Sequence, residues 1–252
     1  MNPSVLIPIA LGTNRNQDLA DAFAAAGATT YQVPLQALRD GETKLADHQL
    51  LALPGGFSYG DALGAGRLLG LDLEGWFADQ LQEARAASMP IFGVCNGFQA
   101  LVRAGLLPGP DTEVALVENA SARFECRWVS LDPEPGSHSP WLAGLTEPLR
   151  CPVAHGEGRL AATDRTVLQD RVSFRYVASD GFRAEGMYPA NPNGSVDDVA
   201  GLTDETGLVI GLMPHPEDHV FARQDPLRGR NGGAGGGGNC LDLFRAGVAA
   251  VA

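Results

Sequence analysis

The chain has 252 residues, of which 44% are hydrophobic and 19% are charged. This length and balance fit an ordinary globular protein with a sizeable core, and they exclude a disordered or fibrous chain. The formal net charge of −12 argues against a protein that binds nucleic-acid phosphates, because no basic block offsets it.

The first residues predict a strand and not a targeting segment. The stretch "MNPSVLIPIALGTNRN" has no basic region before its apolar run, and Pro8 interrupts that run. No apolar run in the chain is long enough to span a bilayer. The four cysteines contain no C-x-x-C pair, which speaks against zinc sites and redox motifs. We therefore expect a cytoplasmic protein without a disulfide framework.

The first hundred residues alternate between strand and helix patterns. Strands are predicted at 5–11, 29–34, 48–56 and 90–94, and helices at 17–27 and 74–88. In the first helix, Leu19, Phe23 and Ala26 share one face, and Gly27 marks its end. Such alternation predicts a parallel sheet that is covered by helices on both faces.

The second half is richer in strands. Alternating patterns predict strands at 122–131 and 172–179, and a strand pair at 198–212 that turns between Asp204 and Gly207. Residues 228–240 are low in complexity and predict a flexible glycine-rich loop, followed by a helix at 241–251. The fold class is therefore α/β, with a mostly parallel central sheet and a small antiparallel layer, in a single domain over 1–252.

Lys44 is the only lysine of the chain. A phosphate-binding P-loop requires a lysine in a glycine-rich turn, and Schiff-base chemistry requires a lysine amine. Because Lys44 lies in the polar stretch "RDGETKLADHQ", it suits neither role. We expect that the chain does not hydrolyse ATP by itself.

Cys95 lies in the pattern "PIFGVCNGFQ", where a predicted strand runs into G-x-C-x-G and then a helix. This is the pattern of a nucleophile elbow, which presents an exposed thiol at the carboxyl end of the sheet. The amide of Asn96 would then point toward a developing oxyanion, at a helix N-terminus whose dipole favours a thiolate. The alternative is a structural cysteine buried in the turn between strand and helix.

A base and an orienting group follow a late strand in "GLVIGLMPHPEDHV". Pro216 should keep this segment extended, so that Glu217 projects to the same side as His215 and fixes its imidazole. The alternatives are a polar strand end or a metal cluster of His215, Glu217 and His219. Pro216 disfavours the cluster because a helical histidine pair cannot run through it. The predicted triad is Cys95, His215 and Glu217, with no metal.

The segment "LPGGFSYGDALGAGR" follows the third predicted strand. Gly55 and Gly56 would let a backbone amide approach the reacting carbonyl from the side opposite Asn96. Glycine-rich loops also bind phosphate, but the G-x-x-x-x-G-K pattern is missing. We therefore predict an oxyanion hole formed by Gly56 and Asn96.

These motifs together resemble the class I glutamine amidotransferases, which have a flavodoxin-like fold. The finer pattern is similar to the glutaminase subunits of phosphoribosylformylglycinamidine synthase, from de novo purine biosynthesis. The resemblance covers nearly the whole chain. It rests on "GTNRNQDLADAFAAAGA", "PGGFSYGDALGAGR", "GVCNGFQALVRAGLLPG", "ENASARFECRW", "HGEGR", "NPNGS" and "MPHPEDHVF", in that order.

The resemblance implies that the chain hydrolyses glutamine to glutamate and ammonia, with Gln99 as a substrate contact or as a solvent-facing side chain. Ammonia would pass to a large ATP-dependent synthase subunit, often joined by a small third subunit. ATP and magnesium would then bind only in the partner, and this chain would need no cofactor. His155, Glu157 and Arg159 either face that partner or form a structural turn.

One rival interpretation is an autonomous cysteine hydrolase of γ-glutamyl or peptide bonds on a similar sheet. It would use the same elbow and need no partner. It leaves "HGEGR" and "NPNGS" unexplained. A non-catalytic regulatory module is the other alternative, and an intact Cys95, His215 and Glu217 speaks against it.

Overall fold

The computed structural model describes residues 2–110, 112–227 and 240–251. Within these ranges, nine strands form one sheet and two further strands form a separate ribbon. The flexible loop predicted at 228–240 lies outside the described residues, apart from Cys240.

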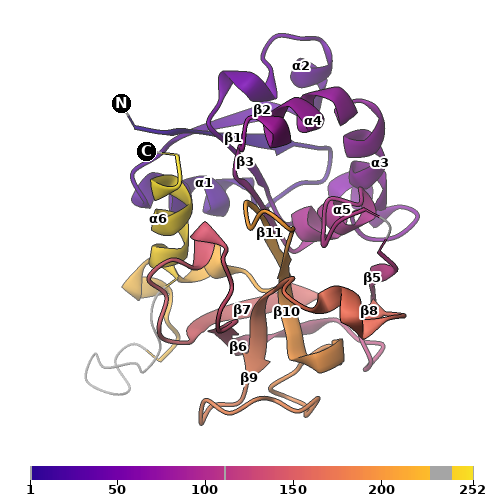
Figure 1. The fold of residues 1–252 in the computed structure, drawn as a ribbon, viewed down its shortest axis with the longest axis vertical. Coiled ribbons are helices and arrows are strands. Elements are labelled where there is room, and N and C mark those ends of the chain that lie inside the picture. Colours follow the sequence, from indigo (N-terminus) through magenta and orange to yellow (C-terminus); the bar gives the residue numbers. More distant parts are fainter. Residues whose placement is uncertain (1, 111, 228–239, 252) are drawn as a thin grey trace.

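One half of the large sheet is parallel (Figure 1), as the alternation of strands and helices predicts. Its strands run in the order β2–β1–β3–β4–β11, and each neighbouring pair is parallel. Their bounds are β1 (Ser4–Ile9), β2 (Thr29–Pro34), β3 (Leu50–Leu53), β4 (Ile91–Val94) and β11 (Val209–Leu212). All five lie where the sequence predicts strands.

The other half continues the same sheet with antiparallel pairs, in the order β11–β10–β9–β6–β7. Its strands are β10 (Val199–Thr203), β9 (Val172–Val177), β6 (Glu125–Pro133) and β7 (Leu149–His155). The separate ribbon pairs β5 (Val114–Glu118) with β8 (Glu157–Ala162). The sequence analysis predicts β6, β9 and β10 but misses β5, β7 and β8.

The helices are α1 (Asn16–Ala25), α2 (Leu35–Arg39), α3 (Arg67–Gly75), α4 (Ala78–Ala86), α5 (Asn96–Arg103) and α6 (Leu241–Ala249). The single helix predicted at 74–88 is wrong in its start, because the chain forms α3 and α4 with a break between them. Trp76 and Phe77 both donate their amides to the Asp72 carbonyl, which closes α3 before α4 begins. None of the described helices is long and apolar enough to cross a membrane.

Helices cover both faces of the parallel half, and β4 shows how. The ring centroid of Phe92 lies 6.0 Å from that of Phe23 in α1 and 5.5 Å from that of Phe244 in α6. Trp141 completes this aromatic core, with its ring centroid 5.2 Å from that of Phe92. The next residue, Gly93, points to the opposite face, where an added Cβ would lie 2.5 Å from Leu101 of α5. The predicted cover on two faces is therefore confirmed.

Candidate active site

Cys95 forms a sharp turn between β4 and α5. Its backbone has φ +50° and ψ −107°, a conformation that non-glycine residues adopt rarely and that concentrates at functional sites. The Cys95 amide donates to the carbonyl of Leu212 at 2.8 Å, which ties the turn to the end of β11. The predicted elbow geometry is confirmed.

The prediction of an exposed thiol is wrong. Only 5% of Cys95 is accessible to solvent. The glycines on either side leave room for packing and not for solvent: a Cβ on Gly97 would lie 2.2 Å from the carbonyl oxygen of Leu53 in β3. Helix α5 therefore packs close against β3 and β4, and the buried Cys95 lines a pocket.

His215 and Glu217 follow β11 and come together as predicted. The Nδ1 of His215 lies 2.7 Å from Oε1 of Glu217, and both side chains are buried. The expected extended conformation is wrong, because Pro216–His219 form a 3₁₀ turn with Pro216 in its first position. This turn still directs the carboxylate back onto the imidazole.

The imidazole of His215 bridges the carboxylate and the thiol. Burial disfavours its charged form, but Glu217 and a hydrogen bond with the Cys95 sulfur outweigh burial and raise the pKa of His215 well above its ordinary value. Gly55 lies against both partners: an added Cβ would fall 2.9 Å from Cε1 of His215 and 3.4 Å from Cβ of Cys95. The arrangement can deprotonate a thiol and hold a protonated imidazole beside it.

Of the predicted oxyanion donors, Gly56 lines the same pocket as Cys95, and Asn96 directly follows Cys95 in the chain. Gly56 has φ +123°, and a Cβ there would collide with the Asn14 side chain at 2.7 Å. Asn96 is the first residue of α5, and its side chain accepts from Oγ of Ser58 at 2.5 Å. An amide in the first turn of a helix has no partner within that helix. Their role in oxyanion binding stays a prediction.

Gln99 uses its side chain within the protein. Its Nε2 donates to the carbonyl of Glu157, and its Oε1 accepts from Nδ2 of Asn96 at 3.2 Å. It is not among the residues that line the pocket over Cys95. The predicted substrate contact stays a prediction, whereas the described contacts make Gln99 a link between α5 and the start of β8.

A pocket of about 270 Å³ opens over Cys95 and His215. Its remaining lining residues come from five separate parts of the chain. They are Asn14, Arg15, Gly56, Phe57, Phe124, Cys126, Pro152, Val153, Ala154 and Asp218. Sequence reasoning missed Arg15 and Asp218, although each lies within a motif that it quoted.

Comparisons with known proteins agree with this geometry. A family model described as a CobB/CobQ-like glutamine amidotransferase domain matches residues 2–250. The PurQ subunit of phosphoribosylformylglycinamidine synthase from Treponema denticola is 39% identical and covers 98% of each chain. The PurQ subunit from Dehalococcoides mccartyi is 41% identical over 85% of each chain. The chain belongs to the PurQ family of glutamine amidotransferases.

Solved structures support the same assignment. A chain from the Thermotoga maritima PurLQS structure matches this PurQ-family chain with a TM-score of 0.78 and 31% identity, and each chain is covered completely. A putative GMP synthase subunit from Thermoplasma acidophilum matches with a TM-score of 0.59 but only 15% identity. That second likeness shows a shared fold alone.

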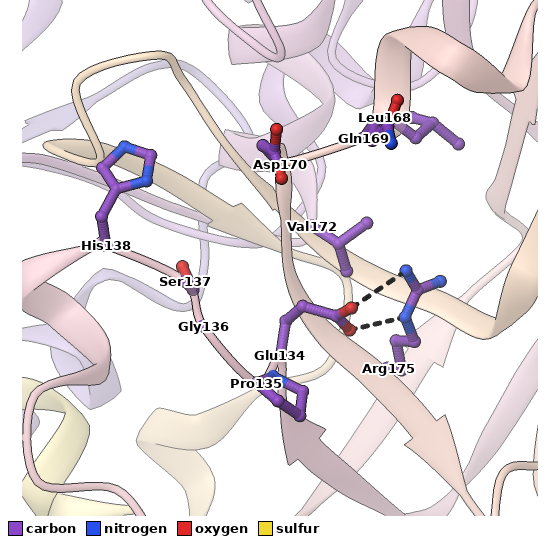
Figure 2. Close-up of a pocket in the computed structure, with 10 residues that line it drawn as sticks. All are labelled: Glu134, Pro135, Gly136, Ser137, His138, Leu168, Gln169, Asp170, Val172 and Arg175. Carbon is purple, nitrogen blue, oxygen red and sulfur yellow. Dashed lines mark hydrogen bonds and ion pairs between the residues drawn. The ribbon is translucent and has the colours of Figure 1, made fainter.

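A second pocket of this PurQ-family chain lies in the antiparallel half and has a volume of about 240 Å³. Figure 2 shows that Glu134 and Arg175 pair across it, with Arg175 Nε 2.6 Å from Glu134 Oε2. Neither a cysteine nor a lysine is among its described lining residues. The pocket over Cys95 is therefore the candidate active site.

His155 of the "HGEGR" motif is buried, so the structure favours the structural alternative for it. Asn119 donates through Nδ2 to the carbonyl of His155 at 2.7 Å, and its Oδ1 lies 3.1 Å from Nδ1 of the imidazole. Burial and the nearby His215 lower the pKa of His155 to about 4, so the ring is neutral. Arg159 is anchored through Nε to the carbonyl of Glu118 at 3.0 Å, and Glu157 accepts from the Ala65 amide at 3.3 Å.

The other cysteines differ in environment. Cys151 and Cys240 are fully buried and hydrogen-bond each other, whereas Cys126 is exposed at the pocket.

The alternative metal cluster of His215, Glu217 and His219 is not the group of ligand atoms that the fold brings together. Among the described residues, His215, Glu217 and Asp218 have ligand atoms within 4.8 Å of one another, while His219 faces the carbonyl of Arg150.

Proposed function

We propose that the chain hydrolyses the side-chain amide of glutamine, with Cys95 as nucleophile, His215 as general acid and base, and Glu217 as the orienting carboxylate. One observation carries this proposal. A thiol on a strained elbow contacts an imidazole that a buried carboxylate holds at 2.7 Å, at the base of a pocket of about 270 Å³.

The chemistry follows from the positions of these groups. The Cys95 thiolate attacks the amide carbon, and the amides of Gly56 and Asn96 stabilise the oxyanion of the tetrahedral intermediate. Protonated His215 gives its proton to the departing nitrogen, which leaves ammonia and a glutamyl thioester. His215 then takes a proton from water, which attacks the thioester. Glutamate leaves and the thiol is restored.

Ammonia has to reach its acceptor unprotonated, because ammonium is no nucleophile. We infer that a partner receives it directly. The PurQ relatives are named as synthase subunits, and the similar Thermotoga maritima chain belongs to a PurLQS structure. The partners of this chain would be a large PurL-type subunit, which binds ATP and magnesium, and a small PurS-type subunit. Together they would convert formylglycinamide ribonucleotide to formylglycinamidine ribonucleotide.

The relatives support this division of labour against an autonomous cysteine hydrolase, because relatives that cover most of the chain carry the names of synthase subunits. Lys44, the only lysine, is not among the residues that line the pocket, which fits a site for ATP in the partner and not in this pocket.

Reconstitution with the large and small subunits tests the proposal. Glutamine should drive synthesis only when this chain is present, and Cys95→Ala should remove that activity. A high concentration of ammonium should restore synthesis to the large subunit without this chain. A large subunit that still depends on the chain in excess ammonium would contradict a role limited to ammonia supply.

A further inference from the structure

Two oppositely charged side chains stand together on the wall of the candidate active site. Nη2 of Arg15, from the loop after β1, forms an ion pair with Oδ1 of Asp218, from the turn after β11. Both residues line the same pocket as Cys95 and His215. Their side chains keep 36% and 22% of their accessible surface, so a ligand in the pocket can reach them.

Asp218 lies about one substrate length from the imidazole of His215. A carboxylate oxygen of Asp218 lies within 4.8 Å of a ring nitrogen of His215. In extended glutamine, three carbon–carbon bonds of about 1.5 Å separate the amide carbon from the α-carbon, a span of about 4 Å. An amide held at Cys95 and His215 therefore brings the α-carbon and its two charged groups beside Asp218 and Arg15.

The charges at this wall are suited to a ligand that carries both signs. Burial and the Glu217 carboxylate raise the pKa of Asp218 to about 6, although Arg15 and His215 oppose the rise. A substrate ammonium beside Asp218 would add a positive charge where the carboxylates of Asp218 and Glu217 lie close together. Arg15 has five N–H donors, of which Nη2 faces Asp218 and Nη1 faces Asp18 at 3.2 Å. The guanidinium retains donors for a carboxylate.

The other walls are mostly apolar. Phe57 and Phe124 flank the pocket and are partly exposed, and Val153 lies among its lining residues. Side chains of this kind suit the two methylene groups between the amide and the α-carbon. Among the described residues that line the pocket, no arginine, lysine, aspartate or glutamate other than Arg15 and Asp218 is present.

We propose that Arg15 binds the α-carboxylate of glutamine and Asp218 binds its α-ammonium, so that the pocket selects a free zwitterionic amino acid. This inference rests on the glutaminase function proposed above and deepens it. A glutamine inside a peptide lacks both charges, so the same pair excludes protein substrates.

Two truncated substrates test the assignment, because each lacks one charged group. 4-Carbamoylbutanoate is glutamine without the α-amino group, and 4-aminobutanamide is glutamine without the α-carboxylate. The assembled complex should hydrolyse glutamine with a kcat/KM at least about tenfold above that of either analogue, as expected for a charge-assisted hydrogen bond. A wild-type complex that treats all three alike would overturn the proposal without any variant.

Variants then assign the groups. Asp218→Asn should lose most of the preference for glutamine over 4-carbamoylbutanoate, mainly through KM. Arg15→Gln should lose most of the preference over 4-aminobutanamide. Asp18→Asn is the matched control, because it removes the other carboxylate beside Arg15 from a residue that does not line the pocket. It should keep both preferences.

The outcomes distinguish a failure of the Arg15 and Asp218 assignment from a failure of the glutaminase function. If Asp218→Asn and Arg15→Gln lower kcat for all three substrates equally and keep the preferences, the pair only tunes Glu217 and His215, and the assignment is overturned. If the wild-type complex shows no Cys95-dependent hydrolysis of glutamine, the glutaminase function itself fails. Calorimetry of glutamine binding to the Cys95→Ala protein tests the contact without turnover. Adding Asp218→Asn to that protein should weaken the binding of glutamine, and unchanged binding would overturn the assignment.

Discussion

The two halves of the large sheet contribute differently to the pocket. The parallel half supplies the proposed reacting groups, since Cys95 and His215 follow the neighbouring strands β4 and β11. The antiparallel half supplies the opposite wall through Pro152, Val153 and Ala154 of β7. Parallel strands thus fix the chemistry at their carboxyl ends, as in other open α/β sheets, while antiparallel strands close the space around it.

This closure requires a strongly curled sheet. In the strand order, β7 lies four positions from β11 at the far edge. Even so, the amide of His215 donates to the carbonyl of Pro152 at 2.8 Å, and the Cys95 sulfur faces the carbonyl of Ala154 at 3.9 Å. The twist of the antiparallel half returns its edge strand to the active site.

The comparison predicts that thiols from the two halves are not equivalent, although both line the pocket. Cys95→Ala should lower glutamine hydrolysis by about 10⁴-fold or more, because the nucleophile works as a unit with its base. Cys126→Ser, from the antiparallel half, should keep turnover within a few-fold. Steady-state kinetics of the complex decide this, with circular dichroism to confirm folding. Loss of activity in Cys126→Ser alone would reverse the assignment.

His215 and Glu217 should differ in the size of their effects. In the proposed mechanism His215 exchanges protons in both half-reactions, so His215→Ala should nearly eliminate turnover. Glu217→Gln should retain a turnover rate about 10 to 100 times higher than that of His215→Ala, as seen for orienting carboxylates in other triads. It should also lower the pKa of His215, because Glu217 is a major cause of its rise.

The rate of Cys95 alkylation at neutral pH reports whether the thiol is paired with the imidazolium. In His215→Ala, which lacks the imidazolium, alkylation should be slower, and in Glu217→Gln the loss of rate should be smaller. Unchanged rates in both variants would mean that neither side chain acts on the thiol.

Gly55 tests how closely the parallel half packs around its catalytic groups. In Gly55→Ala the new methyl group would lie 2.9 Å from Cε1 of His215, which forces the imidazole to shift. A displacement of this kind should lower kcat by about 10 to 100-fold. Gly75→Ala is a suitable control, because a Cβ there meets no atom within 4 Å. Equal rates for the two variants would show that the imidazole tolerates the contact.

His155 gives the smallest expected effect, on stability and not on rate. Its pKa of about 4 lies below the unfolded value of 6.5, so the unfolded chain binds a proton that the folded chain does not. Stability should therefore fall as pH drops from about 6.5 to about 4, by on the order of 3 kcal/mol from this group. His215 has the opposite sign, since its raised pKa stabilises the fold at low pH and that stabilisation is lost as pH rises.

The measurement is urea unfolding of wild type and His155→Gln at several pH values. The free energy of unfolding of the variant should depend less steeply on pH between about 6.5 and 4. Parallel curves for the two proteins would contradict a buried neutral imidazole at this position.

The parallel half was predictable because its signals are local. A short apolar strand, a glycine on each side of Cys95, and a strand that ends before His215 and Glu217 all lie within a few residues of the groups that they position. The burial of the thiol was not predictable, because it depends on the approach of α5 to β3, from a distant part of the chain.

The antiparallel wall was harder to predict for a physical reason. Strand β7 alternates inward residues with outward ones, but His155 occupies an inward position and Pro152 interrupts the run. Proline in a strand is tolerated at an edge, where β7 lies. The ion pair of Arg15 with Asp218 joins residues that are 203 positions apart, so no local sequence pattern predicts it.

The aromatic core beneath β4 has a consequence for synthesis of the chain. Phe23, Phe92, Trp141 and Phe244 pack together, and the last of them lies in α6. Domains fold as their residues leave the ribosome, from the N-terminus onward. The strand that precedes Cys95 therefore lacks one of its aromatic partners until α6 has left the ribosome, long after β4 itself. A nascent chain interrupted before α6 cannot complete the packing beneath the Cys95 turn.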